Sequence, residues 1–290
     1  MFQSVVYKSQ AHKDAIMALY DQKMASLGVP CESMYIPTPV GSTHVLRMGN
    51  AELPALVAFH GINAGAPVTL EALQGLSERF CIYAIDTIGQ ATRSAEVRLP
   101  LKGPALGEWL VAVLDGLQLD KVYAVGVSYG AFLLQKLMQV APERIEKAAF
   151  VVPSGLVNGP FWASMRKLSL PLMRFHRSKK RSDLEKFLSA FHTELDAHWL
   201  ELHYQLLVGT KMDYRRPPLL QKADVKQLQA PVYALVAEED VFFPGQAALE
   251  RCRHIFPNFA GQYVLKGAKH MPTTDRYAEI QQQLRLWFGV

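Results

Sequence analysis

The sequence has 290 residues, of which 50% are hydrophobic and 20% charged, and its formal net charge is +5. This composition is typical of a soluble globular protein with one large domain or two ordinary ones. No run approaches about 18 consecutive apolar residues and the amino terminus lacks a signal-peptide pattern, so we expect a cytoplasmic location without membrane insertion.

Composition also bears on nucleic-acid and metal functions. The basic run Arg174–Arg181 is the only concentrated positive segment, and no RNA motif, zinc finger or glycine-rich phosphate loop accompanies it. The cysteines Cys31, Cys81 and Cys252 are widely spaced and match no metal-ligand pattern. We therefore expect reduced thiols, no nucleic-acid partner, no metal and no organic cofactor.

The first fifty residues predict a helix followed by a hairpin. Residues 12–28 have helical character and end at Gly28, and the stretch 33–49 predicts two strands that turn at Val40 and Gly41.

From residue 54 onward, short apolar runs alternate with helical segments. The apolar runs are continuous, which is typical of strands covered on both faces. This order predicts an α/β fold with a doubly wound, mostly parallel sheet. The predicted strands are 54–60, 81–86, 121–127, 147–152, 231–237 and 260–267, and the predicted helices are 69–80, 105–119, 131–142, 245–256 and 276–288.

About seventy residues interrupt this alternation, and they look helical throughout. Both ends of the interruption leave the carboxyl edge of the sheet, so we expect the segment to fold over that edge as a cap. The sequence thus predicts a core of residues 1–153 and 225–290 and a helical cap of residues 154–224. Its large apolar side chains, some of which we expect to face a substrate pocket, include Phe161, Trp162, Met165, Leu168, Leu172, Met173, Phe187, Phe191 and Trp199.

The stretch Lys121–Leu137 leads a predicted strand through Gly-x-Ser-x-Gly into a predicted helix. A sharp turn there would expose the hydroxyl of Ser128 and crowd the flanking positions, which are Gly126 and Gly130. The free N–H groups of the following helix would favour an oxyanion. Ser128 is therefore the candidate nucleophile.

A serine nucleophile needs a base and an acid that orients the base. Of nine histidines, His270 follows the last predicted strand, in a loop at a strand's carboxyl end. The acid candidates Glu238, Glu239 and Asp240 follow the preceding strand and lie between Ser128 and His270 in chain order.

Four segments carry a family resemblance: "FHGINAG", "AIDTIGQATRS", "LVAEEDVFFP" and "LKGAKHMP". Together with the serine motif, they resemble those of the α/β-hydrolases over nearly the whole chain, and the amino-terminal region resembles small bacterial carboxylesterase-like members. This resemblance implies that Ser128 is the nucleophile, Asp240 the orienting acid and His270 the general base. The backbone N–H groups of Ile62 and Tyr129 would form the oxyanion hole.

The resemblance implies a serine hydrolase that cleaves small to medium carboxylic esters through an acyl-enzyme intermediate. Its expected partner is a small-molecule apolar ester, and a homodimer stays open. "GQATRS" lacks the second glycine common in its segment and "HGIN" differs from a His-Gly-Gly-Gly loop, which leaves the substrate class open. An amide or carbon–carbon bond hydrolase with the same triad, or a ligand-binding protein on this scaffold, are the alternatives.

Two other polar residues at strand ends have structural interpretations. His60 ends a buried strand and is expected to hold its loop by hydrogen bonds rather than to act as a second base. Asp86 ends the next strand and is expected to fix a turn. The cap histidines His192, His198 and His203 do not form a His-Glu-x-x-His metal motif.

Overall fold

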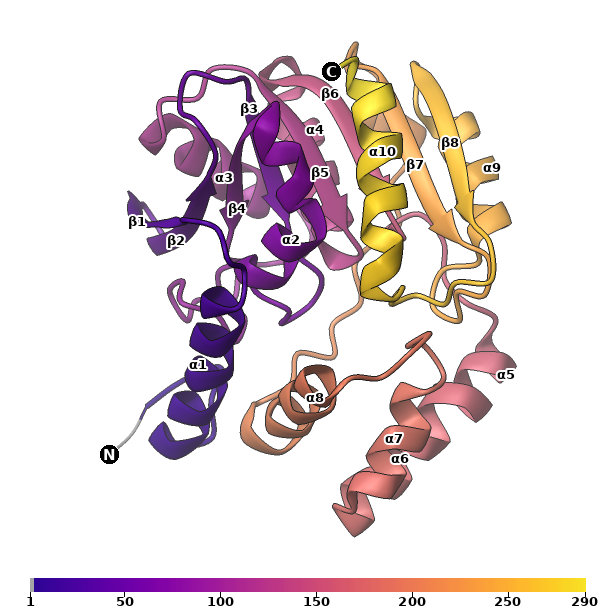
Figure 1. Cartoon of the computed structure of the whole chain (residues 1–290). Helices are drawn as coiled ribbons and strands as arrows, with labels where there is room; N and C mark the ends of the chain where they lie inside the picture. Colours follow the sequence, from indigo (N-terminus) through magenta and orange to yellow (C-terminus); the bar gives the residue numbers. More distant parts are fainter. Residues whose placement is uncertain (1–2) are drawn as a thin grey trace.

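The computed structural model describes residues 3–290, which contain one eight-stranded sheet (Figure 1). The strand order is β1-β2-β4-β3-β5-β6-β7-β8; the β1–β2 and β2–β4 pairs are antiparallel and the other neighbours are parallel. The predicted α/β class with a mostly parallel sheet is thus confirmed. The strands are β1 (Glu32–Thr38), β2 (Gly41–Met48), β3 (Ala55–Phe59), β4 (Cys81–Ile85), β5 (Val122–Val127), β6 (Ile145–Val151), β7 (Val232–Ala237) and β8 (Phe259–Leu265).

Helices cover both faces of this sheet, which explains why the central strands are continuously apolar. Helices α2 and α10 pack on one face, and α3, α4 and α9 on the other (Figure 1). Every residue of β4 is buried, whereas the edge strand β8 is mostly part-exposed. These helices are α2 (Ala66–Leu73), α3 (Ala105–Gly116), α4 (Tyr129–Val140), α9 (Gly245–Ile255) and α10 (Tyr277–Phe288).

The hairpin turn lies one residue earlier than the sequence predicts. Pro39 and Val40 form the turn, while Gly41 already pairs with Thr38 as the first residue of β2. Gly41 has φ 124°, and a Cβ there would lie 2.6 Å from Cβ of Ala95. Only glycine therefore allows the start of β2 to pack this closely against Ala95.

The segment between β6 and β7 lies at the carboxyl end of the parallel strands (Figure 1). It is not helical throughout, because residues 189–196 form turns and a short bridge to the loop after β8. A wider π-helical turn at Met165–Ser169 joins its first two helices. The helices are α5 (Phe161–Ser164), α6 (Leu170–Ser178), α7 (Arg181–Leu188) and α8 (Ala197–Gly209).

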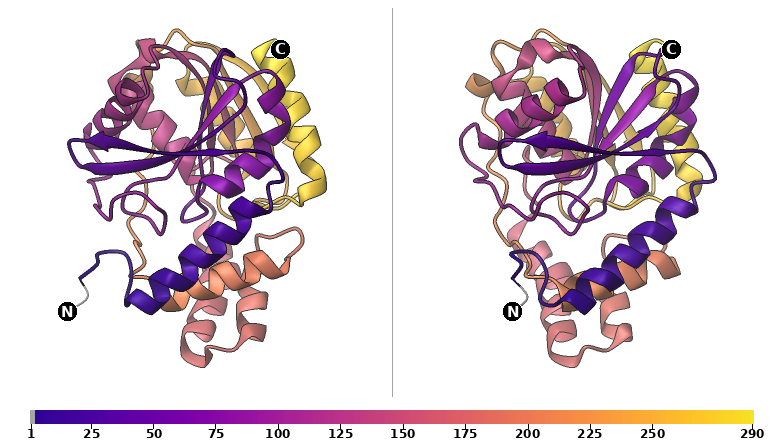
Figure 2. Two further views of the ribbon diagram at one scale, coloured as in Figure 1. Left: turned by 60° about the vertical axis from the view of Figure 1, so that its left-hand side comes forward. Right: turned by 90° about the vertical axis from the view of Figure 1, so that its left-hand side faces the viewer.

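The amino-terminal segment joins this helical layer. Helix α1 (Gln10–Ala25) lies beside α8 (Figure 2), and Tyr7 forms an antiparallel bridge with Thr210. The N–H of Lys211 donates to the carbonyl of Val6, and the N–H of Lys8 donates to Gly209. The start of the chain therefore holds the end of α8 over the sheet.

Across residues 3–290, we find no helix with both the length and the apolar character needed to cross a membrane.

Candidate active site

Ser128 lies at the turn between β5 and α4, in a backbone conformation that is rare for a residue with a side chain. Its φ is 52° and its ψ is −113°. Its N–H donates to the carbonyl of Val151 at 2.9 Å, and its carbonyl accepts from the N–H of Ser154 at 3.2 Å. Both bonds tie the turn to the end of β6, and they hold a conformation that costs about 1–3 kcal/mol elsewhere in proteins.

The two glycines beside this turn are required by close packing. A Cβ on Gly126 would lie 2.6 Å from Cα of Ala131, and a Cβ on Gly130 would lie 2.1 Å from the carbonyl oxygen of Phe59. No side chain fits at such distances, so helix α4 can approach the sheet only because both residues are glycine.

The side chains of Ser128, His270 and Asp240 meet at the carboxyl end of the sheet. His270 Nε2 lies 2.9 Å from Ser128 Oγ, and His270 Nδ1 lies 2.7 Å from Asp240 Oδ2. All three side chains are buried. Because a carboxylate only accepts hydrogen bonds, Nδ1 carries the proton that it donates to Asp240, and Nε2 is left to accept the proton of Ser128.

Of the three consecutive acids after β7, only Asp240 reaches His270. Its other oxygen, Oδ1, accepts the N–H groups of Phe242 at 2.8 Å and Phe243 at 3.0 Å. Glu238 instead binds Lys266 and the N–H of Gly267 at the surface, and Glu239 is exposed. The backbone bonds fix the Asp240 carboxylate in one orientation toward the imidazole.

The two residues expected to form an oxyanion hole lie on either side of Ser128. Tyr129 is the first residue of α4, so its N–H has no acceptor within the helix. The loop after β3 approaches from the other side, since a Cβ on Gly61 would lie 3.6 Å from Cβ of Ser128. Within residues 3–290, the N–H of Ile62 donates to no other residue. Both N–H groups are thus available to an oxyanion.

His60 and Asp86 have the structural roles expected of them. His60 Nε2 accepts the N–H of Thr87 at 2.9 Å, and Nδ1 donates to Gly61 at 2.6 Å. Burial lowers the pKa of His60, so it stays neutral. The fully buried Asp86 carboxylate accepts from Tyr20, His44 and two backbone N–H groups, and the bond from His44 helps to lower its pKa against the effect of burial.

A segment of the helical layer contacts the His270 loop, a contact that the sequence did not predict. The N–H of Met271 donates to the carbonyl of Phe191 at 2.8 Å, and the N–H of Thr193 donates back to Met271 at 3.0 Å. Thr193 Oγ1 also accepts the N–H of Lys269 at 3.0 Å. Residues on both sides of His270 are thus bonded to residues 191–193, and the rings of Phe242 and Phe243 lie 5.0 and 5.5 Å from its imidazole.

The cap histidines do not form a metal site in the part of the chain that the structure describes. The buried His192 and the half-buried His203 lie side by side, with ring centroids 5.2 Å apart. Burial lowers the pKa of His192 to about 3 and that of His203 to about 4, so both are neutral at physiological pH.

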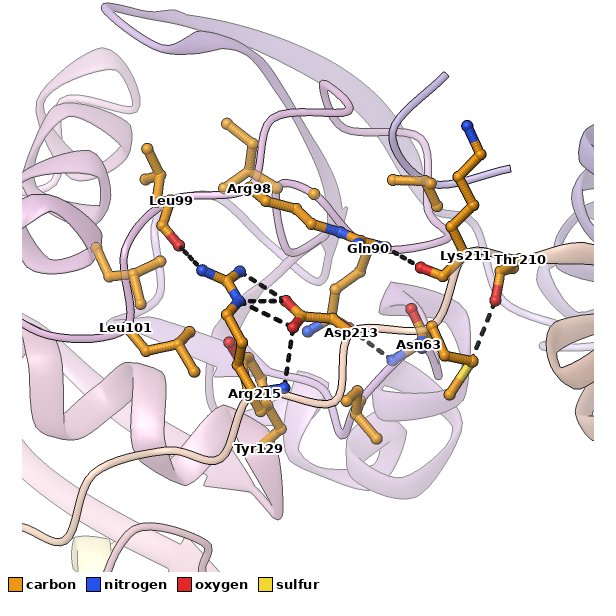
Figure 3. A pocket seen from close by; sticks show the side chains of 16 residues that line it. Asn63, Gln90, Arg98, Leu99, Leu101, Tyr129, Thr210, Lys211, Asp213 and Arg215 are labelled. Atoms are coloured by element: carbon orange, nitrogen blue, oxygen red, sulfur yellow. Dashed lines mark hydrogen bonds and ion pairs between the residues drawn. The ribbon is translucent and has the colours of Figure 1, made fainter. Parts of the chain in front are cut away.

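A cleft opens beside the two oxyanion residues (Figure 3). It is narrow, with a volume of about 30 Å³, and its walls include Ile62, Tyr129 and the charged residues Arg98, Asp213 and Arg215. The large aromatic residues of α5 do not line it: Phe161 is 62% and Trp162 is 80% exposed. The walls of this cleft are therefore more polar than the sequence predicts.

Comparison with known proteins agrees with this architecture. A model of the alpha/beta hydrolase fold family matches residues 54–215, which is more than half of the chain. The chain belongs to this family, and it is a hydrolase of the α/β-hydrolase fold.

Its relatives include carboxylesterases of Bacillus subtilis. Carboxylesterase YbfK is 24% identical over 91% of this chain and 90% of its own length, and a second protein, "uncharacterized carboxylesterase nap", is 23% identical over 93% and 91%. The crystal structure of naproxen esterase from the same species has a TM-score of 0.82 and 23% identity, and covers 97% of this chain and 99% of its own. The predicted resemblance to small bacterial carboxylesterases is thus confirmed.

Proposed function

We propose that this protein hydrolyses carboxylic esters, with Ser128 as nucleophile, His270 as general base and Asp240 as the acid that orients it. One observation carries the proposal: a continuous relay of hydrogen bonds runs from Ser128 Oγ through both ring nitrogens of His270 to Asp240. Its relatives named as carboxylesterases support an ester as the substrate.

The reaction proceeds in two halves through an acyl-enzyme intermediate. Ser128 Oγ attacks the ester carbonyl carbon while its proton passes to His270 Nε2, and the backbone N–H groups of Ile62 and Tyr129 bind the resulting oxyanion. His270 then protonates the departing alcohol, which leaves Ser128 acylated. In the second half, His270 takes a proton from water, the hydroxide oxygen attacks the acyl carbon, and the acid departs as the proton returns to Ser128.

We further propose that the substrate is a small to medium ester with an apolar acyl part. The aromatic rings of Phe242 and Phe243 beside His270 favour an apolar group there. Residues 154–224 would form a cap over the core made by residues 1–153 and 225–290, because α5–α8 lie at the carboxyl end of the sheet. The cytoplasmic location stays a prediction.

The test is hydrolysis of 4-nitrophenyl butyrate by the purified protein and by Ser128→Ala, together with labelling by a fluorophosphonate probe. We expect turnover and labelling at Ser128 in the wild type, and loss of both by several orders of magnitude in the variant, with unchanged folding. Labelling without catalytic turnover would favour a ligand-binding protein on the same scaffold. Cleavage of amides or carbon–carbon bonds in preference to esters would reassign the substrate while keeping the nucleophile.

A further inference from the structure

The cleft beside the oxyanion residues presents more hydrogen-bond donors than acceptors. The side-chain oxygen of Gln90 accepts the N–H of Asn63 at 2.6 Å, and the side-chain oxygen of Asn63 accepts the N–H of Ala91 at 3.0 Å. Both amide oxygens are therefore occupied, and both NH₂ groups lack an acceptor within residues 3–290. These amides face the cleft as donors.

The hydroxyl of Tyr129, the residue that follows Ser128 in the chain, adds a third donor to the lining of the cleft. Burial, helped by the negative charge of Asp213, raises the pKa of Tyr129, so the hydroxyl keeps its proton at neutral pH. No residue in the described part of the chain accepts a hydrogen bond from it. One part of a substrate in the cleft can thus accept a hydrogen bond from the Tyr129 hydroxyl, while the ester carbonyl of the same substrate lies at the backbone N–H of Tyr129.

The charges around the cleft are unequal. Asp213 is the only acid of the lining, and its carboxylate is bound by Arg215, whose Nε lies 2.9 Å from Oδ1 and whose Nη2 lies 2.6 Å from Oδ2 (Figure 3). This pairing lowers the pKa of Asp213 and neutralises its charge. Arg215 also donates to the carbonyl of Leu99 at 3.0 Å.

Arg98 makes no hydrogen bond to an acid within residues 3–290, although its charge also acts on Asp213 and helps to lower the pKa of that carboxyl. Its guanidinium donates to the carbonyl of Lys211, and its Nε–H is buried without an acceptor in residues 3–290 (Figure 3). An unbonded buried donor costs about 1–3 kcal/mol, so an anion near Arg98 would offset part of an existing cost. With the Asp213–Arg215 pair neutral, Arg98 and Lys211 of the same lining leave the cleft with an excess positive charge.

We propose that this cleft binds a carboxylate carried by the ester substrate, so that the preferred substrates are esters with a free carboxylate on their acyl or alcohol part. The inference rests on the proposed ester hydrolysis and adds a determinant of specificity to it. The excess charge of Arg98 attracts the carboxylate, and the NH₂ groups of Gln90 and Asn63 and the hydroxyl of Tyr129 bind its oxygens. The apolar part of the same substrate lies on the side of Phe242.

The experiment compares esters that carry a carboxylate, an amide or a methyl group at the same position. One arm uses 3-(butanoyloxy)benzoate, its neutral amide 3-(butanoyloxy)benzamide and 3-methylphenyl butanoate, which place the group on the alcohol part. The other arm uses the mono-4-nitrophenyl ester of suberic acid, the corresponding amide and 4-nitrophenyl octanoate, which place it on the acyl part. In at least one arm, the carboxylate ester should exceed its amide in kcat/KM by about tenfold.

Variants then test which residues create this ratio. Arg98→Gln removes the charge, and Gln90→Glu keeps an oxygen for the N–H of Asn63 but replaces the donor by a second acceptor with negative charge. Both should lower the ratio of carboxylate to amide ester at least fivefold, by about 1 kcal/mol. Arg98→Lys should retain most of it. Arg177→Gln, which removes an exposed charge from α6, is the matched control and should leave the ratio unchanged.

The outcomes separate this inference from the function on which it rests. If the ratio of carboxylate to amide ester is unchanged in both Arg98→Gln and Gln90→Glu, the inference is overturned. This holds whether activity on the two esters stays the same or falls equally, because either result means that charge is not recognised. If neutral esters are hydrolysed in a Ser128-dependent way under those results, the proposed function stands. If no ester is hydrolysed at all, the proposed function itself fails.

Discussion

At the scale of single residues, the arrangement around Asp240 shows how three equivalent acids in the sequence acquire different roles. All three follow β7 within one turn, but only the third points inward, where two backbone N–H groups bind one of its oxygens. The other two lie at the surface, where a carboxylate is already hydrated. Asp240 therefore differs from Glu238 and Glu239 in its burial, although all three side chains are carboxylates.

We expect Asp240→Asn to lower kcat by several orders of magnitude, since an amide oxygen at this position would favour the wrong tautomer of His270. Glu238→Gln and Glu239→Gln should each change kcat less than about twofold, because exposed charges contribute little. The three variants are compared by steady-state hydrolysis of 4-nitrophenyl butyrate. A larger loss in either glutamate variant than in Asp240→Asn would show that the orienting acid is misassigned.

At the scale of elements, the turn between α7 and α8 is hydrogen-bonded to the loop after β8, which carries His270. Residues 191–193 are bonded to both neighbours of His270, through their backbone to Met271 and through Thr193 Oγ1 to Lys269, so the position of the imidazole depends on a segment far away in the sequence. Two histidines of the same region whose pKa is lowered by desolvation, His192 and His203, add a dependence of stability on pH.

We expect Thr193→Val to lower kcat about fivefold, because it removes the oxygen that accepts the N–H of Lys269, and a hydrogen bond contributes about 1 kcal/mol. KM should change much less, since Thr193 does not line the cleft. Thr193→Ser keeps the oxygen and should restore most of kcat. Equal activity of the valine and serine variants would mean that this bond does not position His270.

We expect the wild type to lose stability as pH falls from about 6.5 to about 4, partly through His203. The unfolded chain protonates this histidine below about pH 6.5, whereas burial keeps it neutral in the folded protein down to about pH 4. Acid therefore favours the unfolded chain across this window, by about 3 kcal/mol at pH 4 for this one group.

The measurement is the free energy of urea unfolding between pH 4.5 and pH 8 for the wild type and His203→Gln. Glutamine can still donate to the carbonyl of Trp199, which His203 Nδ1 contacts at 2.8 Å, but it does not titrate. The variant should show a shallower loss of stability in acid. Identical slopes for the two proteins would contradict the role of His203.

At the scale of the whole molecule, the carboxyl end of the sheet carries Ser128, His270 and Asp240, while the segments around it define the space beside them. The sheet side is rigid, because helices bury it on both faces. The cleft instead takes its walls from the loop after β3, the loop after β4 and the segment after α8. The cleft and the three side chains thus lie on different parts of the chain, and Ile62 and Tyr129 lie between them.

We expect turnover to be highest with butyryl or octanoyl esters and lowest with palmitoyl esters, because each methylene gains about 0.8 kcal/mol only until the enclosed space is filled. Acetyl, butyryl, octanoyl and palmitoyl 4-nitrophenyl esters are compared in the wild type and in Phe242→Ala. The variant, which lacks a ring beside His270, should shift this profile. Best turnover on the palmitoyl ester, or an unshifted profile, would contradict a size limit set by this wall.

The sequence by itself determined the sheet, the turn that carries Ser128 and the loops that carry Asp240 and His270. These features depend on local chemistry and chain order: continuous apolar runs predict covered strands, and glycine at positions 126 and 130 permits a close approach of helix and sheet. The family resemblance then selected Asp240 among three acids, and the structure gives the physical basis in its backbone bonds.

Only the tertiary structure decided what surrounds the site. Arg98 and Arg215 lie far apart in the chain, and nothing in the sequence distinguishes an arginine in a cleft from one in solvent. The same holds for the apolar residues of the helical segment, where Trp162 is exposed and Phe191 is buried although both fit the helical pattern. The periodicity of a sequence indicates which side chains lie on the same face of a helix. Which segment covers that face depends on packing between parts of the chain that are distant in sequence.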